Sequence, residues 1–130
     1  MDLNNSPTTH MKTYQNYING RFTPSAGDGA IEVLNPSTGE VISRVPESTA
    51  SDLEMALDAA HAAQPAWAKR PAIERANLLR QISARLRENV KPLARVIVEE
   101  QGKTLGLAEV EVNFTADYID YMAEWARRIE

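Results

Sequence analysis

The stretch "EEQGKTLGLAEVE", residues 99–111, contains Gly102-Lys103-Thr104, the triplet that ends the phosphate-binding loop G-x-x-x-x-G-K-[ST]. That loop needs another glycine five residues earlier, where this chain has Ile97. It also follows a β-strand, whereas the residues before Gly102 recur at helical spacing: Leu93, Val96, Ile97 and Glu100. A glycine after a helical run is most simply a C-cap, because it adopts a left-handed backbone at little steric cost. The sequence therefore predicts a helix that ends at Gly102 and no phosphate site.

Amphipathic helices are predicted on the N-terminal side of Gly102. Ser51 and Glu54 have the spacing of a capping box at a helix start. An apolar stripe follows at Leu53, Ala56, Leu57, Ala60 and Ala63. Pro65 is expected to stop or kink this helix, while Pro71 and Pro92 suit the first turns of two more. The inward positions predicted for the helix after Pro71 are Leu79, Ile82, Leu86 and Val90.

A last helix is predicted beyond Gly102, again from apolar residues three and four apart: Leu107, Val110, Phe114, Tyr118, Tyr121, Met122, Trp125 and Ile129. An aromatic stripe of this kind is more often core packing than the wall of a ligand site. The acidic residues nearby are Glu109, Glu111 and Glu124. We interpret them as part of the solvent-exposed face of the helix rather than as a catalytic carboxylate pair.

Strand signals precede the helices. Asn19-Gly20 between short apolar runs predicts a hairpin with a two-residue turn. "AIEVLNP" (30–36) and "VISRVP" (41–46) read as two further strands. The expected organisation is a disordered leader over residues 1–12, a small antiparallel sheet over 14–46 and a helical region over 51–130, with α/β as the fold class.

The composition of the chain excludes several classes of partner and of catalytic site. The 130 residues suffice for one ordinary domain, and the formal net charge of −4 argues against nucleic acid as a partner. No apolar run is long enough to cross a bilayer and nothing resembles a signal peptide, so we expect a cytoplasmic protein without a membrane partner. The chain has no cysteine, which excludes a thiol nucleophile within it, and His10 and His61 are too isolated in sequence to predict a metal site.

Arginines recur every five residues in the middle of the chain, at Arg70, Arg75, Arg80 and Arg85. Five residues rotate a helix by about 140°, so these side chains do not form one basic stripe. They predict a solvated, salt-bridged surface rather than a nucleic-acid patch.

The order of segments resembles the N-terminal portion of the NAD(P)-dependent aldehyde dehydrogenase superfamily. The resemblance rests on "YINGRF", "VLNPSTGEVISRVP", "DLEMALDAAHAAQPAW" and the run from "AIERANLL" to "LGLAEVEV", and "NPSTGEVI" with "EEQGK" is its most specific pair. The tail "EVEVNFTADYIDYMAEWARR" is most similar to the lactaldehyde or glycolaldehyde branch, while succinate-semialdehyde dehydrogenases also resemble the "EEQGK" region.

The resemblance implies that residues 13–130 are the N-terminal portion of a cofactor-binding domain, an incomplete fold. It implies an enzyme that oxidises small aldehydes to carboxylic acids with NAD or NADP, and a homo-oligomer when full length. The family's catalytic cysteine and glutamate and its cofactor-binding residues lie beyond Glu130, so this chain alone is expected to be inactive and to bind no cofactor. The alternative is a free-standing helical interaction module or a pseudoenzyme remnant.

One site carries over from the resemblance. Alignment on Trp125 in "AEWARR" matches Val110 and Phe114 to two positions that line the aldehyde tunnel in family members. The two residues are four apart and share a helix face. The competing interpretation, that both are core residues, stays open at the level of the sequence.

Overall fold

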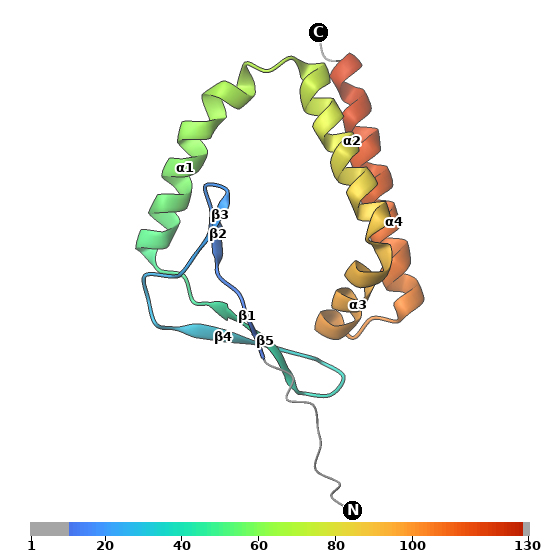
Figure 1. Ribbon diagram of the computed structural model, residues 1–130. Helices are drawn as coiled ribbons and strands as arrows, with labels where there is room; N and C mark the ends of the chain where they lie inside the picture. The colour runs from blue at the N-terminus through green and yellow to red at the C-terminus, as the bar shows by residue number, and fades with distance from the viewer. Residues whose placement is uncertain (1–10, 129–130) are drawn as a thin grey trace, which may run out of the picture.

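The computed structural model describes residues 11–128, in which short strands precede long helices (Figure 1). In chain order the elements are β1 (Lys12–Thr13), β2 (Asn16–Ile18), β3 (Arg21–Thr23), β4 (Ala30–Leu34), β5 (Val41–Pro46), α1 (Ala50–Ala68), α2 (Ala72–Glu88), α3 (Val90–Gln101), α4 (Leu105–Glu124) and the 3₁₀ turn η1 (Trp125–Arg127). Residues 1–10 of the predicted leader, with His10, and Ile129 of the predicted last stripe lie outside the described residues. Lys12 was expected in the leader but lies in β1, where it pairs with Ser43.

The predicted sheet is present as two small sheets. β4 and β5 pair antiparallel, and β1 joins β5 in parallel, which gives the order β1-β5-β4. β2 and β3 form a separate antiparallel hairpin, with φ of 51° at Asn19 and 77° at Gly20 as a type I′ turn requires. The parallel β1 is the departure from the antiparallel prediction, because a two-residue strand leaves no periodic signal in the sequence.

The first helix differs from the prediction at both ends. Its capping box is formed by Thr49 and Asp52 rather than by Ser51 and Glu54. α1 also continues through Pro65 to Ala68 instead of stopping at the proline. The extra turn persists because the Pro65 carbonyl still accepts a hydrogen bond from the backbone N–H of Lys69 at 3.3 Å.

Small residues form the surface on which α2, α3 and α4 pack together. α2 contributes Ala76 and Ser83, α3 contributes Ala94, and α4 contributes Ala108, Val112, Ala116 and Ala123. Short side chains allow the helix axes to approach closely. Arg87 of α2 then bridges Asp117 and Asp120 of α4 at 2.7 and 2.8 Å. The core of the described residues is therefore an alanine-rich seam with ion pairs along its edge.

The large apolar residues predicted to point inward lie mostly outside this seam. Leu53 and Leu57 of α1, Ile82 of α2 and the described residues of the predicted last stripe are exposed, with Phe114 at 69% of its maximal surface. The helical period is confirmed, but the predicted faces are covered only in part, since Leu79 and Leu86 of α2 and Val90 of α3 are half-buried. Within the described part of the chain the alanines, not the larger side chains, mark the face that is covered.

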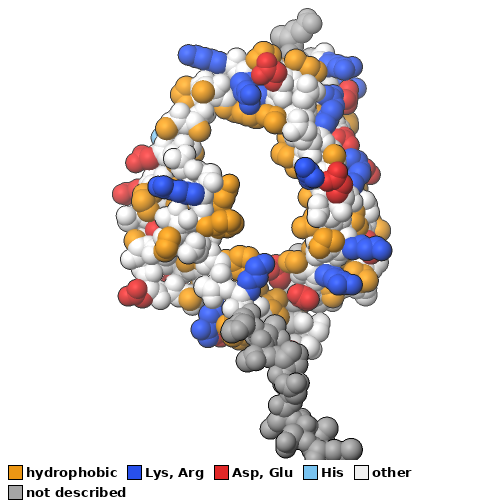
Figure 2. Space-filling model, in the orientation of Figure 1, with side chains coloured by type: hydrophobic (Ala, Val, Ile, Leu, Met, Phe, Trp, Pro, Cys, Tyr) orange, Lys and Arg blue, Asp and Glu red, His pale blue; other side chains and the backbone are white. Residues whose placement is uncertain are grey.

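The elements form a ring (Figure 1). α1 stands on one side, α2 and α4 stand on the other, and the β4–β5 sheet crosses below them. The space-filling view shows an opening through the middle, with hydrophobic side chains gathered around it (Figure 2). Large apolar side chains of these helices remain exposed, among them Leu53 of α1, Ile82 of α2 and Phe114 of α4.

The ring closes at Gly102. This residue ends α3 with φ of 67°, the left-handed C-cap predicted from the sequence. A Cβ atom at Gly102 would lie 3.1 Å from Ser37 Oγ and 3.2 Å from Pro36 Cγ, so the β4–β5 turn packs directly on it. The two motifs "NPSTGEVI" and "EEQGK", more than sixty residues apart in the chain, therefore meet here.

Candidate functional site

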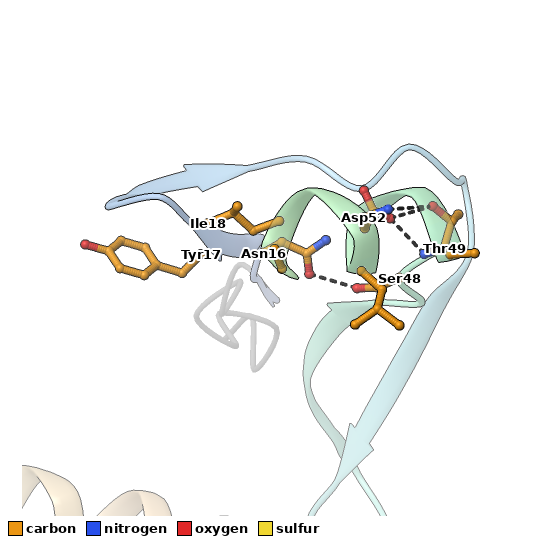
Figure 3. A pocket seen from close by; sticks show the side chains of 9 residues that line it. Asn16, Tyr17, Ile18, Ser48, Thr49 and Asp52 are labelled. Atoms are coloured by element: carbon orange, nitrogen blue, oxygen red, sulfur yellow. Dashed lines mark hydrogen bonds between the residues drawn. The ribbon is translucent and has the colours of Figure 1, made fainter. Parts of the chain in front are cut away.

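A polar pocket of about 500 Å³ lies where the hairpin meets the start of α1 (Figure 3). The Ser48 hydroxyl donates to Asn16 Oδ1 at 2.8 Å, and the apolar part of the wall comes from Ile18, Leu53 and Ala56. The buried carboxylate of Asp52 lies at the edge of the pocket.

Asp52 is saturated by donors. Its carboxylate accepts hydrogen bonds from the Thr49 backbone N–H at 2.8 Å, the Ser25 hydroxyl at 2.7 Å, the Ala26 backbone N–H at 3.0 Å and the Thr49 hydroxyl at 2.9 Å. These donors, the Thr49 N–H first, lower the pKa of Asp52 from 3.8 to about 2. A carboxylate held ionised by four donors is a poor general base. Asp52 therefore joins the loop at residues 25–27 to α1 and leaves this pocket without an acid or base.

The predicted tunnel residues lie on the exposed face of α4. Val110 and Phe114 are 63% and 69% exposed, and they lie on the opposite side of α4 from its buried residues Ala108, Val112 and Ala116. They are therefore not core residues within the described part of the chain. Tyr118, Tyr121 and Trp125 continue the same exposed face, with Tyr121 and Trp125 in edge contact at 6.2 Å between ring centroids.

The acidic residues near this face, Glu109, Glu111 and Glu124, do not point to one common site. Glu111 pairs with Lys103 at the start of α4, and Glu124 pairs with Arg80 at 2.7 Å near its end. Fifteen residues of α-helix separate Glu109 from Glu124, a rise of about 22 Å. Glu111 and Glu124 are thus each held in an ion pair and lie too far apart to act together as a carboxylate pair, which agrees with the predicted polar face of the helix.

Three of the four regularly spaced arginines form the predicted ion pairs. Arg70 pairs with Glu74 at 3.5 Å and Arg85 with Glu88 at 2.8 Å, in addition to Arg80 with Glu124. Arg75 differs: its Nε is buried and has no hydrogen-bond partner among residues 11–128. Its side chain lies beside Trp67, Leu79, Met122 and Trp125. This exception could not be predicted, because spacing along a helix does not show which arginine has a carboxylate opposite it.

Metal and nucleotide sites are not formed by the described residues. Residues 11–128 contain no cluster of three potential metal ligands. No described glycine opens a helix directly after a strand, and Gly102 of "GKT" ends a helix, which confirms the predicted C-cap. None of the helices in this part of the chain is both long and apolar enough to cross a bilayer.

Comparison with known proteins gives the family. Residues 22–130 match the model of the Aldehyde dehydrogenase family. Lactaldehyde dehydrogenase of Escherichia coli (strain K12) is 59% identical over 114 residues, which cover 88% of this chain and 24% of that relative. A crystal structure of lactaldehyde dehydrogenase from Escherichia coli superposes with a TM-score of 0.89 at 56% identity, and covers 92% of this chain and 25% of that one. A structure of 3,6-anhydro-L-galactose dehydrogenase in complex with NAP superposes at 0.88 with 38% identity, over 92% of this chain and 25% of that one.

This chain belongs to the aldehyde dehydrogenase family. It spans about a quarter of the length of the relatives that it matches. The resemblance read from "NPSTGEVI" and "EEQGK" is confirmed, and so is the N-terminal position of the matched region within a larger α/β fold.

Proposed function

We propose that this chain forms the N-terminal portion of an NAD- or NADP-dependent enzyme that oxidises a small aldehyde to the carboxylic acid. The observation that carries the proposal is the 59% identity with lactaldehyde dehydrogenase, together with the family match over residues 22–130. A succinate-semialdehyde dehydrogenase is 35% identical, which favours a lactaldehyde-like substrate over a semialdehyde with a second carboxylate.

The chain alone is proposed to be inactive. Oxidation by this family needs a thiolate to attack the carbonyl, and the sequence contains no cysteine. The described residues also do not fit a dinucleotide, because no glycine-rich turn leads from a strand into a helix. No step of the reaction is therefore assigned to residues of this chain. Its proposed contribution, as part of the cofactor-binding domain over residues 13–130, is to shape the approach to the site.

The cofactor, the location and the assembly of the whole enzyme are proposed more generally. A relative bound to NAP supports a nicotinamide dinucleotide without deciding between NAD and NADP. A cytoplasmic, homo-oligomeric enzyme is the expectation from the family resemblance.

A chimaera tests the activity. The segment of Escherichia coli lactaldehyde dehydrogenase that aligns with this chain would be replaced by residues 17–130. We expect the chimaera to oxidise lactaldehyde or glycolaldehyde with a nicotinamide cofactor, followed by absorbance of the reduced cofactor, while the 130-residue chain shows no turnover above a boiled control. A folded chimaera without aldehyde oxidation would contradict the proposed function.

Val110 and Phe114 are proposed to line the aldehyde tunnel. Their support is the exposed face of α4, on which they lie one turn apart and are 63% and 69% exposed. Phe114 would narrow the entrance and favour small aldehydes.

In the chimaera, Phe114→Ala is therefore expected to raise kcat/KM for bulky aldehydes relative to glycolaldehyde by roughly tenfold, the value of one lost contact in an apolar pocket. Leu105→Ala, an exposed apolar position at the start of α4 and outside this helix face, is the matched control and should leave the ratio unchanged. An equal loss for both substrates with a lower melting temperature would make Phe114 a packing residue.

A further inference from the structure

An apolar groove of about 320 Å³ runs between the start of α2 and the end of α4, and Trp67 from the end of α1 closes one side. We call it the Arg75 groove. It is lined by Trp67, Ala72, Arg75, Ala76, Leu79, Met122, Ala123, Trp125 and Ala126. Arg75 is the sole charged residue of this lining.

Within residues 11–128, Arg75 has no ion-pair partner, unlike the other three arginines of the series. Each of the other three arginines in the series lies within 3.5 Å of a glutamate, whereas no carboxylate of residues 11–128 forms an ion pair with Arg75. Its Nε–H is shielded from solvent and donates to no acceptor within the described residues. A buried donor of a charged group that remains unsatisfied is destabilising. An acceptor is therefore expected from outside this part of the chain, arriving with whatever covers the apolar walls.

We propose that the Arg75 groove docks the complementary three-quarters of an aldehyde dehydrogenase polypeptide, which supplies a backbone carbonyl or a carboxylate to Arg75. The inference rests on the proposed function. Three observations favour this occupant. The matched relatives are about four times as long as the matched region. The ring superposes at a TM-score of 0.89 on a chain of that length, so it already has the shape that it takes within the larger fold. The large apolar residues of the groove are also left partly uncovered, with Trp67, Met122 and Trp125 at 43%, 42% and 39% exposure.

A second copy of this chain fits the groove less well. In a two-fold dimer the same patch meets itself. The groove lining contains no aspartate or glutamate, so two copies would bring two Arg75 cations together without an acceptor. A partner that carries its own acceptor avoids this repulsion.

The experiment measures how Arg75→Met changes the melting temperature of the 130-residue chain and of the chimaera. Arg75→Met and the control Arg95→Met, an exposed arginine of α3, are made both in the 130-residue chain and in the chimaera. We expect Arg75→Met to leave the melting temperature of the 130-residue chain unchanged or higher, because it removes an unpaired charge. In the chimaera, where the acceptor is present, Arg75→Met should lower the melting temperature and Arg95→Met should not. Arg75→Lys should restore part of that loss.

Docking between separate chains is measured in parallel. This chain is co-expressed with the remainder of Escherichia coli lactaldehyde dehydrogenase, beginning at the residue aligned after Glu130, and the relative's own N-terminal segment serves as the positive control. We expect a one-to-one complex on co-purification. Arg75→Met should weaken it about tenfold or more, the value of a hydrogen bond to a charged group, while Arg95→Met changes it little.

Each outcome decides the proposal. It is overturned if the remainder is captured by its own N-terminal segment but not by this chain. It is overturned equally if Arg75→Met and Arg95→Met behave alike in both settings, or if this chain forms a dimer that the remainder does not displace. A docked complex or a destabilised Arg75→Met chimaera without aldehyde oxidation would leave the docking surface standing while the proposed function fails.

Discussion

The α2–α4 unit and the arm made of β1–β5 and α1 are held together in different ways. In the helical unit, alanines and Ser83 are almost fully buried, and the helices fit by shape along their length. In the arm, the strands are largely exposed, and the described contacts concentrate at two places. One is the Asp52 carboxylate with its four donors, and the other is the turn at Pro36 and Ser37 against Gly102. The stability of a region held by close packing should depend on the size of its buried side chains. The stability of a region held by a few polar contacts should depend on the hydrogen-bonding groups that make those contacts.

The largest expected effect is a change of volume in the seam. Ala116 is completely buried between α4 and α2, so Ala116→Leu has no space to enter and should destabilise the helical unit by about 1–3 kcal/mol. The same change at Ala62, an exposed alanine of α1, is the matched control and should cost little. Urea unfolding followed by helical circular dichroism measures both. Equal costs at the two positions would remove the distinction between the two regions.

Gly102 tests the junction between them. Gly102→Ala should destabilise by roughly 1–2 kcal/mol, because alanine disfavours the left-handed backbone. The added methyl group would also press on Ser37 and Pro36. Gly106 is the matched control: it lies within α4 with open space around it, and Gly106→Ala should stabilise by about 0.5–1 kcal/mol. If both substitutions stabilise the chain in urea unfolding, the ring is not closed at Gly102.

The smallest effect concerns Asp52 and is confined to acid. Its pKa is lowered from 3.8 to about 2 by folding, so the stability that it contributes is complete above pH 4 and is lost as the pH falls toward 2. We expect the α1 end of the arm to loosen over this range, measured by hydrogen exchange at Leu53 and Ala56. In Asp52→Asn the loosening should already be present at neutral pH, whereas Asp58→Asn, in the exposed part of the same helix, should behave as the parent chain. An unchanged profile in Asp52→Asn would contradict the role given to this carboxylate.

Much of the architecture could be predicted because it depends on local signals. Asn19-Gly20 predicts its hairpin through the positive φ of both residues, and Gly102 predicts the end of α3 in the same way. The helices could be predicted because apolar residues recur at the spacing of a helix turn. The capping box was displaced by two residues because Thr49 and Asp52 fit the same pattern as Ser51 and Glu54, and only the contact of Asp52 with Ser25 distinguishes them.

The packed faces could not be predicted, since burial is a property of the neighbours. Size and hydrophobicity point to Phe114 and Tyr118 as core, yet the buried residues of α4 include Ala108 and Ala116. The site residues Val110 and Phe114 came from the family resemblance, and their role in the tunnel stays a prediction. Arg75 could not be singled out either, because its distinction is a missing partner in space rather than a feature of its spacing.

Trp67 and Trp125 are the two tryptophans of the chain, and both line the Arg75 groove. They are 43% and 39% exposed, with Arg70 over one ring at 5.9 Å and Arg128 over the other at 5.5 Å. The tryptophan fluorescence of the chain therefore comes entirely from indoles at this one place. Covering the groove would move both rings from water into an apolar environment and shift their emission to shorter wavelength. The chain thus carries its own optical probe of whether the groove is filled, and no label is needed to read it.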